Sequence, residues 1–256
     1  MRYKKIKEIL DNFLKRVQLE KENVNVYFIK ESPFYKSKWK KIGVYLDNYK
    51  DIVLKSDTGL ELGGMNKTSF SLIYPIKTTK NTINTNKIII IGPEINDLNS
   101  SKTNFGLFIL LTVKNLSDKL FESLRNFSFI SNGIDGFAIR SIPRRFWCRI
   151  SQNSINKKFS FQFLGNAIIS LYKQKFGKEI NSIEILMITE SSKLINKFLE
   201  HTAEITNELN NRWKVKVDNW KKRIDCDYEW ACEICPYFKS CKSLQEILEE
   251  RKNLEI

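Results

Sequence analysis

The sequence predicts an α+β fold in which a mixed or antiparallel sheet packs against helices, followed by a small helical metal-binding tail. Three observations support this prediction. Apolar residues near the N-terminus recur at helical spacing, and the middle of the chain alternates short β-branched runs with amphipathic segments. Four cysteines fall within sixteen residues near the C-terminal end.

The composition is that of an ordinary folded protein. Hydrophobic residues make up 42% of the 256 residues and aromatic residues 12%, which is too much for a disordered chain. No apolar run approaches the roughly 18 residues that a membrane-spanning helix requires. The N-terminal residues carry charges throughout and lack the apolar block of a secretory signal. We therefore expect a cytoplasmic protein without a membrane span.

The first part of the chain predicts one helix and several strands. Residues 3–17 place apolar side chains along one helical face, with Lys and Glu opposite. Turn signals such as Gly63-Gly64 and Gly92-Pro93 then separate short runs of β-branched and aromatic residues. The expected strands are Val24–Ile29, Ile52–Leu54, Ser69–Tyr74, Lys87–Ile91 and Leu107–Val113.

Helices and strands alternate in the remaining part. The expected elements are a helix over 118–127 capped by Ser117, a strand Phe146–Ile150, a helix over 161–176 closed by Gly177, a strand Ile183–Ile188, a long helix from about Ser192 to Trp213, and a short helix around Leu244–Leu248. We divide the chain into an N-terminal helix and strands over residues 1–54, a central domain over 55–215 and a four-cysteine tail over 216–256.

The tail cysteines have the spacing of a metal site. They are Cys226, Cys232, Cys235 and Cys241. In a cytosolic chain such a cluster indicates metal rather than disulfides, and four thiolates suit either an iron–sulfur cluster or tetrahedral zinc. The proline after Cys235 and the neighbouring aromatic residues favour a 4Fe–4S cluster, while zinc stays the alternative.

The net charge of +14 is less informative than its placement. Half of the excess lies in residues 1–41, which hold 12 Lys or Arg and 5 Asp or Glu. This scatter argues against a nucleic-acid protein. Residues 140–158 contain six Lys or Arg and no acidic residue, so a smaller anion explains that cluster better.

Strand alternation gives this basic stretch two faces. Phe146, Cys148 and Ile150 face one way, which predicts a core position for the cysteine. The candidate binding residues Arg145, Trp147 and Arg149 lie on the other face, and Arg140 and Arg144 precede them in the sequence. Arginines pair with phosphate oxygens and an exposed indole stacks on a purine or a guanidinium, so this face suits a nucleotide-like anion. The alternative is a solvated outer face on which Trp147 covers an edge of the core.

Catalytic motifs are missing from the sequence. His201 has no Cys or Ser partner at motif spacing, and there is neither a phosphate-binding loop nor a G-x-S-x-G motif. These observations leave open whether the chain is catalytic.

Several segments, taken in order, resemble the acetyl-CoA synthase family, the beta subunit of acetyl-CoA decarbonylase/synthase. They are Leu62–Thr68, Ile88–Leu98, Phe146–Ser151, Lys158–Phe176 and Ile183–Thr189. The resemblance holds from about residue 55 to residue 200 and implies that this region is similar to the family's α+β middle domain. It also implies coenzyme A docking at Trp147 and Arg149, with Arg144 or Arg145 as a preceding arginine.

The resemblance is weaker in the tail. In that family the cysteines hold an iron–sulfur cubane bridged to a nickel pair, and Cys232 and Cys235 lie where its first two cubane cysteines belong. The Cys-Gly-Cys that binds the outer nickel in the family does not occur in this sequence. The sequence thus favours a compact relative that binds coenzyme A or acyl-CoA and a cluster, with a role in redox, sensing or assembly in CO or one-carbon metabolism. CO dehydrogenase or another redox protein is the expected partner.

Two alternatives stay open at this point. One is a nickel–iron–sulfur acetyl-CoA synthase subunit that is active with a partner supplying the missing ligands. The other is an iron–sulfur nucleic-acid-binding protein, because the spacing of the last three cysteines also occurs in iron–sulfur nucleases.

Overall fold

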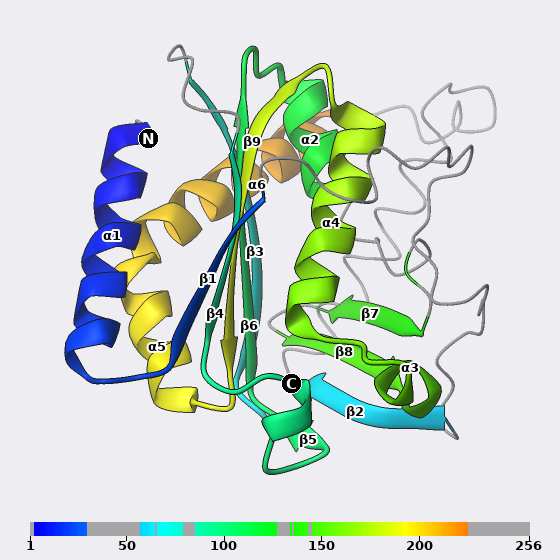
Figure 1. The fold of residues 1–256 in the computed structure, drawn as a ribbon. Helices are drawn as coiled ribbons and strands as arrows, with labels where there is room; N and C mark the ends of the chain where they lie inside the picture. Colours follow the sequence, from blue (N-terminus) through cyan, green and yellow to red (C-terminus); the bar gives the residue numbers. More distant parts are fainter. Residues whose placement is uncertain are drawn as a thin grey trace. The chain divides into compact units, whose positions relative to one another are not determined.

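The computed structural model describes residues 3–29, 57–64, 66–78, 85–126, 134, 136–142 and 145–224 (Figure 1). Its helices are α1 (Tyr3–Leu19), the 3-10 turn η2 (Ile95–Asp97), α2 (Asp118–Asn126), α3 (Gln152–Asn156), α4 (Phe161–Phe176), α5 (Ser192–His201) and α6 (Ala203–Ile224). Its strands are β1 (Val24–Ile29), β2 (Thr58–Gly63), β3 (Ser69–Lys77), β4 (Asn86–Ile91), β5 (Lys102–Thr103), β6 (Phe105–Val113), β7 (Phe137–Ile142), β8 (Arg145–Ser151) and β9 (Ile180–Thr189).

The chain divides into two units, Met1–Ile205 and Thr206–Ile256. The first unit contains all the strands and α1 to α5. The second unit is described only along α6, where Arg212 and Glu208 form an ion pair one helical turn apart, with 3.6 Å between Nη2 and Oε1.

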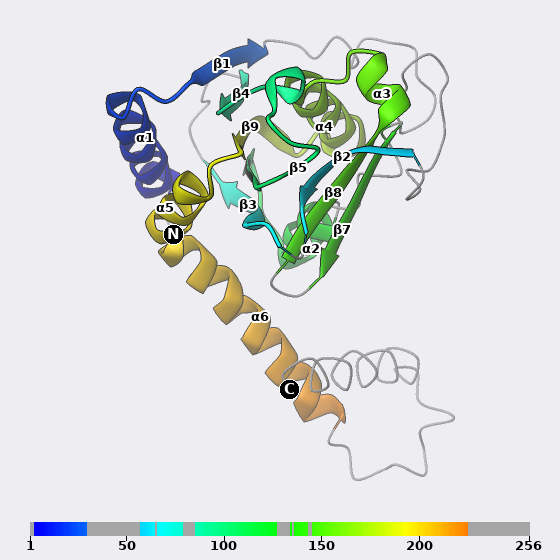
Figure 2. The same ribbon diagram turned by 90° about the horizontal axis from the view of Figure 1, so that it is seen from below.

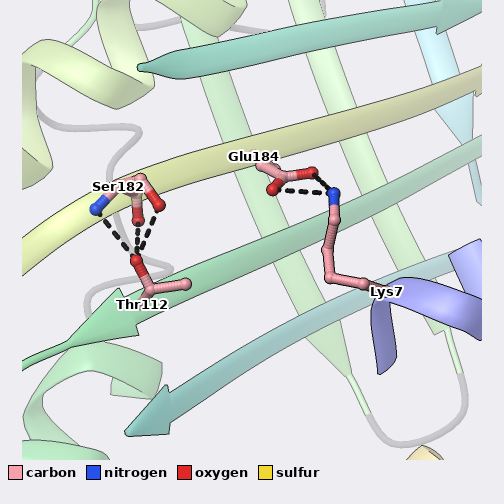
Figure 3. Close-up of polar contacts among 4 residues, drawn as sticks. All are labelled: Lys7, Thr112, Ser182 and Glu184. Carbon is pink, nitrogen blue, oxygen red and sulfur yellow. Dashed lines mark hydrogen bonds and ion pairs between the residues drawn. The ribbon is translucent and has the colours of Figure 1, made fainter. Parts of the chain in front are cut away.

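A five-stranded mixed sheet forms the centre of the first unit, in the order β1-β4-β9-β6-β3. β1 and β4 pair antiparallel, as do β9 and β6, whereas β4 pairs parallel with β9 and β3 pairs parallel with β6. A bulge lies where the β6–β9 register shifts after Thr112. There the Thr112 hydroxyl accepts the Ser182 backbone N–H at 3.0 Å and lies 2.6 Å from the Ser182 hydroxyl, which keeps these buried polar groups paired (Figure 3).

A smaller four-stranded sheet runs in the order β5-β2-β8-β7. β2 pairs parallel with β5 and antiparallel with β8, and β8 pairs antiparallel with β7. Its inner face carries buried side chains such as Leu62, Cys148 and Ile150, which join the core that α4 and the large sheet also line. Phe105 of β6 links these parts, because its ring lies 6.1 Å from that of Phe146 and 5.6 Å from that of Phe161.

Helices α1 and α5 cover the other face of the large sheet (Figures 1 and 2). The apolar stripe of α1, which is Ile6, Leu10, Phe13 and Val17, is buried. The Phe13 ring lies 5.1 Å from that of Phe198 on α5, which in turn lies 5.5 Å from that of Phe108 on β6. The first unit therefore has helices on one face of the large sheet and α4 with the small sheet on the other.

The α+β class and the mixed sheet are confirmed, and α1, β1, β3, β4, β6, α2, β8, α4 and β9 match the expected elements. The long helix expected from Ser192 to Trp213 is wrong as a single element, because α5 ends before Thr202 and α6 starts after it. The buried Thr202 hydroxyl donates to the Phe198 carbonyl at 2.8 Å, and such a bond to the carbonyl four residues earlier often bends a helix.

Two expected elements, Ile52–Leu54 and the helix around Leu244–Leu248, lie outside the described residues, as does the cysteine tail. None of the helices in the described ranges is both long and apolar enough to cross a membrane.

Candidate ligand-binding face of the small sheet

Pairing in the small sheet aligns side chains from three strands on its outer face. Glu61 on β2 lies opposite Lys102 on β5 and opposite Arg149 on β8. We call Lys102, Glu61 and Arg149 the charged row. In the neighbouring row Trp147 lies between Gly63 on β2 and position 140 on β7. Because opposite residues in a sheet share a face, both rows belong to one surface.

Trp147 and Arg149 form the centre of this face. They are two residues apart on β8, so their side chains project to the same side. The Arg149 guanidinium carbon lies 4.0 Å from the centre of the Trp147 ring, which is a cation–π contact. The indole is thus half-buried and lies against a guanidinium of its own chain.

Glu61 carries the negative charge of the charged row. Its Oε2 lies 3.5 Å from Arg149 Nε and its Oε1 lies 4.0 Å from Lys102 Nζ. The side chains of Glu61, Arg149 and Lys102 are 17%, 24% and 68% exposed. The Glu61–Arg149 pair is therefore largely buried, whereas Lys102 is exposed.

Gly63 and Gly64 both have a positive φ where the chain leaves β2. Gly63 has φ +76°, and a Cβ there would lie 2.3 Å from the Phe146 carbonyl oxygen, so only glycine fits. Gly64 has φ +101°, and a Cβ there would lie 3.5 Å from both the Trp147 ring and Glu61 Oε1. The Gly-Gly pair therefore allows the backbone to turn at the end of β2, and Gly64 lies near the Trp147 ring.

Two donors on this face lack a hydrogen-bond acceptor within the described part of the chain. They are Trp147 Nε1 and Arg149 Nε, and both atoms are buried. A buried donor without an acceptor costs about 1–3 kcal/mol, so such groups are uncommon away from functional sites. Within the described residues, Arg149 Nε makes a long contact to Glu61, which contributes charge attraction without hydrogen-bond geometry.

For two of the other predicted binding residues the structure gives the position along a strand, and the third lies outside the described residues. Arg140 lies on β7 opposite Trp147, and Arg145 lies at the start of β8 opposite Ile142, at positions on the same outer face. Arg144 lies outside the described residues. The strand pairing thus brings positions 140, 145, 147 and 149 together on one face of the small sheet.

The four predicted metal ligands Cys226, Cys232, Cys235 and Cys241 all lie outside the described residues. Within the described part of the chain, no group of three or more His, Cys, Asp and Glu side chains lies close enough to hold a metal ion. Cys148 is fully buried in the core, as predicted, and burial raises the pKa of its thiol well above the ordinary value. His201 contacts the Phe13 ring, and its Nδ1 lies 2.8 Å from the Lys197 carbonyl oxygen, which is a structural role.

The N-terminus of α4, another place where an anion can bind, already holds a carboxylate. Glu94 accepts the backbone N–H groups of Phe161 and Gln162 at 2.8 and 3.2 Å, and Ser160 accepts that of Phe163 at 3.0 Å. These contacts satisfy the first N–H groups of the helix and compensate its dipole. The backbone N–H groups of Phe161, Gln162 and Phe163 are therefore already paired with side-chain oxygens of this chain.

Sequence reasoning missed Glu61 and Lys102. Both are far from residue 149 in the sequence, and only the pairing of β5, β2 and β8 brings Glu61 beside Arg149 and Lys102 into the same row. Chemically, the face combines two cations, a carboxylate and an indole, which suits a ligand with anionic oxygens and a flat ring.

Comparison with known proteins assigns a family to this region. Residues 48–194, more than half of the chain, match the family model described as CO dehydrogenase/acetyl-CoA synthase complex beta subunit. The match includes the whole charged row and Trp147, whereas α1, β1 and the four tail cysteines lie outside it.

Similar proteins carry related names. The acetyl-CoA decarbonylase/synthase complex subunit beta of Methanopyrus kandleri is 25% identical over 188 residues, covering 73% of this chain and 38% of that protein. The carbon monoxide dehydrogenase/acetyl-CoA synthase subunit alpha of Moorella thermoacetica is 24% identical over 191 residues, covering 73% of this chain and 25% of that protein. The subunit beta 1 of Methanosarcina thermophila is 27% identical over 193 residues, with 73% and 38% covered. The chain therefore spans well under half of the length of these relatives.

Proposed function

The chain belongs to the CO dehydrogenase/acetyl-CoA synthase complex beta subunit family, and on that premise we propose that it is a compact iron–sulfur protein that binds coenzyme A or an acyl-CoA. It acts in redox, sensing or assembly linked to CO or one-carbon metabolism. Its protein partner is CO dehydrogenase or another redox protein, since the relatives are named as subunits of such complexes.

The stacked pair of Trp147 and Arg149 is the observation that carries the coenzyme A assignment. Coenzyme A combines an adenine with three phosphates, so it needs both a flat surface and several cations. The guanidinium of Arg149 can pair with phosphate oxygens, and the indole and the guanidinium are both surfaces on which a purine can stack. Positions 140 and 145 on the same face add two further arginines along the sheet.

The cysteine tail supplies the proposed metal centre. Four thiolates are the donor set that a 4Fe–4S cluster requires, and zinc is the alternative for the same set. A 4Fe–4S cluster would supply electron transfer or hold the tail together. Nickel is not part of the proposal, because the sequence contains no Cys-Gly-Cys.

Calorimetric titration with coenzyme A tests the binding assignment. The wild-type chain should bind, and Arg149→Ala and Trp147→Phe should each weaken binding by about tenfold, the range for one charge-assisted or stacking contact. Arg16→Ala on the exposed end of α1 removes the same charge elsewhere and should change nothing. Wild-type protein that does not bind coenzyme A, or variants that bind as well as wild type, would reject this site.

Metal analysis after anaerobic purification tests the tail separately. Iron and acid-labile sulfide at about four each per chain are expected, and both should be lost in Cys232→Ser. About one zinc per chain without sulfide would replace the cluster with a zinc site. Cys148→Ser changes a buried core cysteine and should leave the metal content of the folded protein unchanged.

A further inference from the structure

The charged row has an anion between two cations before any ligand arrives. Glu61 lies opposite Lys102 on one side and opposite Arg149 on the other, and its two carboxylate oxygens point one to each. A ligand phosphate that approaches Arg149 on this face meets the carboxylate at the same place. Glu61 is therefore positioned as a counter-ion for the cations that a ligand would use.

The contacts of Glu61 are loose. Charge-assisted hydrogen bonds between a cationic N–H and an anionic oxygen measure about 2.7–2.9 Å. The two contacts in the row measure 3.5 and 4.0 Å, and among the described residues Arg149 Nε has no hydrogen-bond acceptor. The Arg149 side chain is 24% exposed, and a phosphate oxygen that reaches the accessible part of its guanidinium at hydrogen-bonding distance would make a stronger contact than Glu61 does. Arg149 thus stacks on the Trp147 ring, while its Nε has no hydrogen-bond acceptor among the described residues.

We propose that Glu61 is a resident counter-anion that competes with the ligand's phosphate for Arg149 and Lys102 and so sets the affinity of the site for anions. Lys102 belongs to the same site as its second cation. The proposal rests on the coenzyme A function above and adds two residues to it, one that opposes binding and one that supports it.

The competition has a defined electrostatic consequence. With Glu61 ionised the row carries a net charge of +1, whereas replacing Glu61 with Gln leaves two uncompensated cations. Like charges near a protein surface repel each other, and salt screens part of this effect. Glu61→Gln should therefore tighten the binding of a phosphate-bearing ligand by about tenfold. The binding of an uncharged ligand should not change.

The test compares Glu61→Gln with wild type using three probes. These are coenzyme A, pyrophosphate, which has the phosphates alone, and pantetheine, which has the arm without phosphates. We expect Glu61→Gln to bind coenzyme A and pyrophosphate about tenfold more tightly and pantetheine with unchanged affinity. Lys102→Gln should weaken both phosphate-bearing probes, and Glu200→Gln, at an exposed position of α5, should match wild type with all three.

A measurement without ligand separates this proposal from the coenzyme assignment. In 15N-labelled apo protein the Trp147 indole N–H signal should shift in Glu61→Gln, because Arg149 loses its hold above the ring, and should not shift in Glu200→Gln. If coenzyme A fails to bind but this signal shifts and pyrophosphate binds Glu61→Gln more tightly, the role of Glu61 stands and the coenzyme assignment falls. If wild type and Glu61→Gln bind coenzyme A equally, or the variant binds it more weakly, the role of Glu61 is overturned while the site remains. If pyrophosphate binds neither protein, Glu61 competes with nothing and the proposal is also overturned.

Discussion

Replacing Lys7 with Met should destabilise the fold by breaking an ion pair between α1 and the large sheet. Lys7 Nζ donates to both carboxylate oxygens of Glu184 on β9, at 2.9 and 2.7 Å (Figure 3). The two side chains are only 26% and 15% exposed. Lys7→Met keeps most of the apolar stem and removes the charge, so Glu184 is left partly buried without its partner.

The expected cost follows from this intermediate burial. Breaking a buried pair costs about 3–5 kcal/mol, whereas exposed pairs contribute about 0–1 kcal/mol. We expect the free energy of unfolding to fall by about 2 kcal/mol in Lys7→Met and by a similar amount in Glu184→Met. The double variant should lose less than the sum of the two, because it leaves no unpaired charge, with a coupling of about 1–2 kcal/mol.

The pair should also make stability depend on alkaline pH. Burial alone would lower the pKa of Lys7, but the attraction of Glu184 and its hydrogen bonds outweigh burial and raise that pKa above its ordinary 10.5. A raised lysine pKa stabilises the fold fully below the ordinary value, and this contribution is lost as pH rises through the folded-state pKa. The stability difference between wild type and Lys7→Met should thus stay constant from neutral pH and shrink only above about pH 10.5.

Urea unfolding followed by circular dichroism measures both effects. Lys4→Met is the control, because Lys4 Nζ lies 3.9 Å from Glu8 Oε1 with side chains that are 90% and 61% exposed, and its substitution should cost less than about 0.5 kcal/mol. The reasoning is refuted if Lys7→Met costs no more than Lys4→Met, or if the double variant equals the sum of the single variants.

Three further predictions concern the first unit. Glu94→Ala should lower the free energy of unfolding by about 1–3 kcal/mol in urea, because α4 loses the acceptor for its first N–H groups, and Glu94→Gln should recover part of that loss. Gly92→Ala should lower the thermal unfolding temperature more than Gly64→Ala does. Both glycines have φ +101°, but a Cβ at Gly92 would lie 2.5 Å from Thr189 Oγ1, whereas the nearest atom at Gly64 would be 3.5 Å away. Equal losses would contradict the steric argument. Cys148 should stay unmodified by iodoacetamide at pH 8 in native protein and react after unfolding, as peptide mass spectrometry can show, because burial raises its thiol pKa and excludes the reagent.

The local periodicity of apolar residues predicted most of the helices and strands, because it depends only on residues that are close together in the sequence. The stripe of α1 and the alternation along β8 both survive in the structure, including the core position of Cys148. The break at Thr202 was not predicted, because the helical pattern of apolar residues continues across it.

Two residues of the candidate site, Glu61 and Lys102, could not be predicted from the sequence either. The alternation placed Trp147 and Arg149 on one face, but it carries no information on which strands lie beside β8. The partner of Arg149 in the charged row is Glu61 on β2, which also pairs with Lys102 on β5, and no sequence motif marks either residue. Strand order is decided by how the whole core packs, so a charged row across three strands becomes visible only in three dimensions.

The two sheets differ in what they leave available for a ligand. Every residue of β6, in the large sheet, is buried, because helices cover one face and α4 with the small sheet covers the other. A sheet buried on both faces can hold the fold but offers no surface to a ligand. The inner face of the small sheet joins the core, whereas Glu61, Arg149, Lys102 and the Trp147 indole lie on its outer face and keep part of their surface exposed. Substitutions in β6 should therefore act on stability, whereas substitutions at Glu61, Lys102 and Arg149 should act mainly on anion affinity.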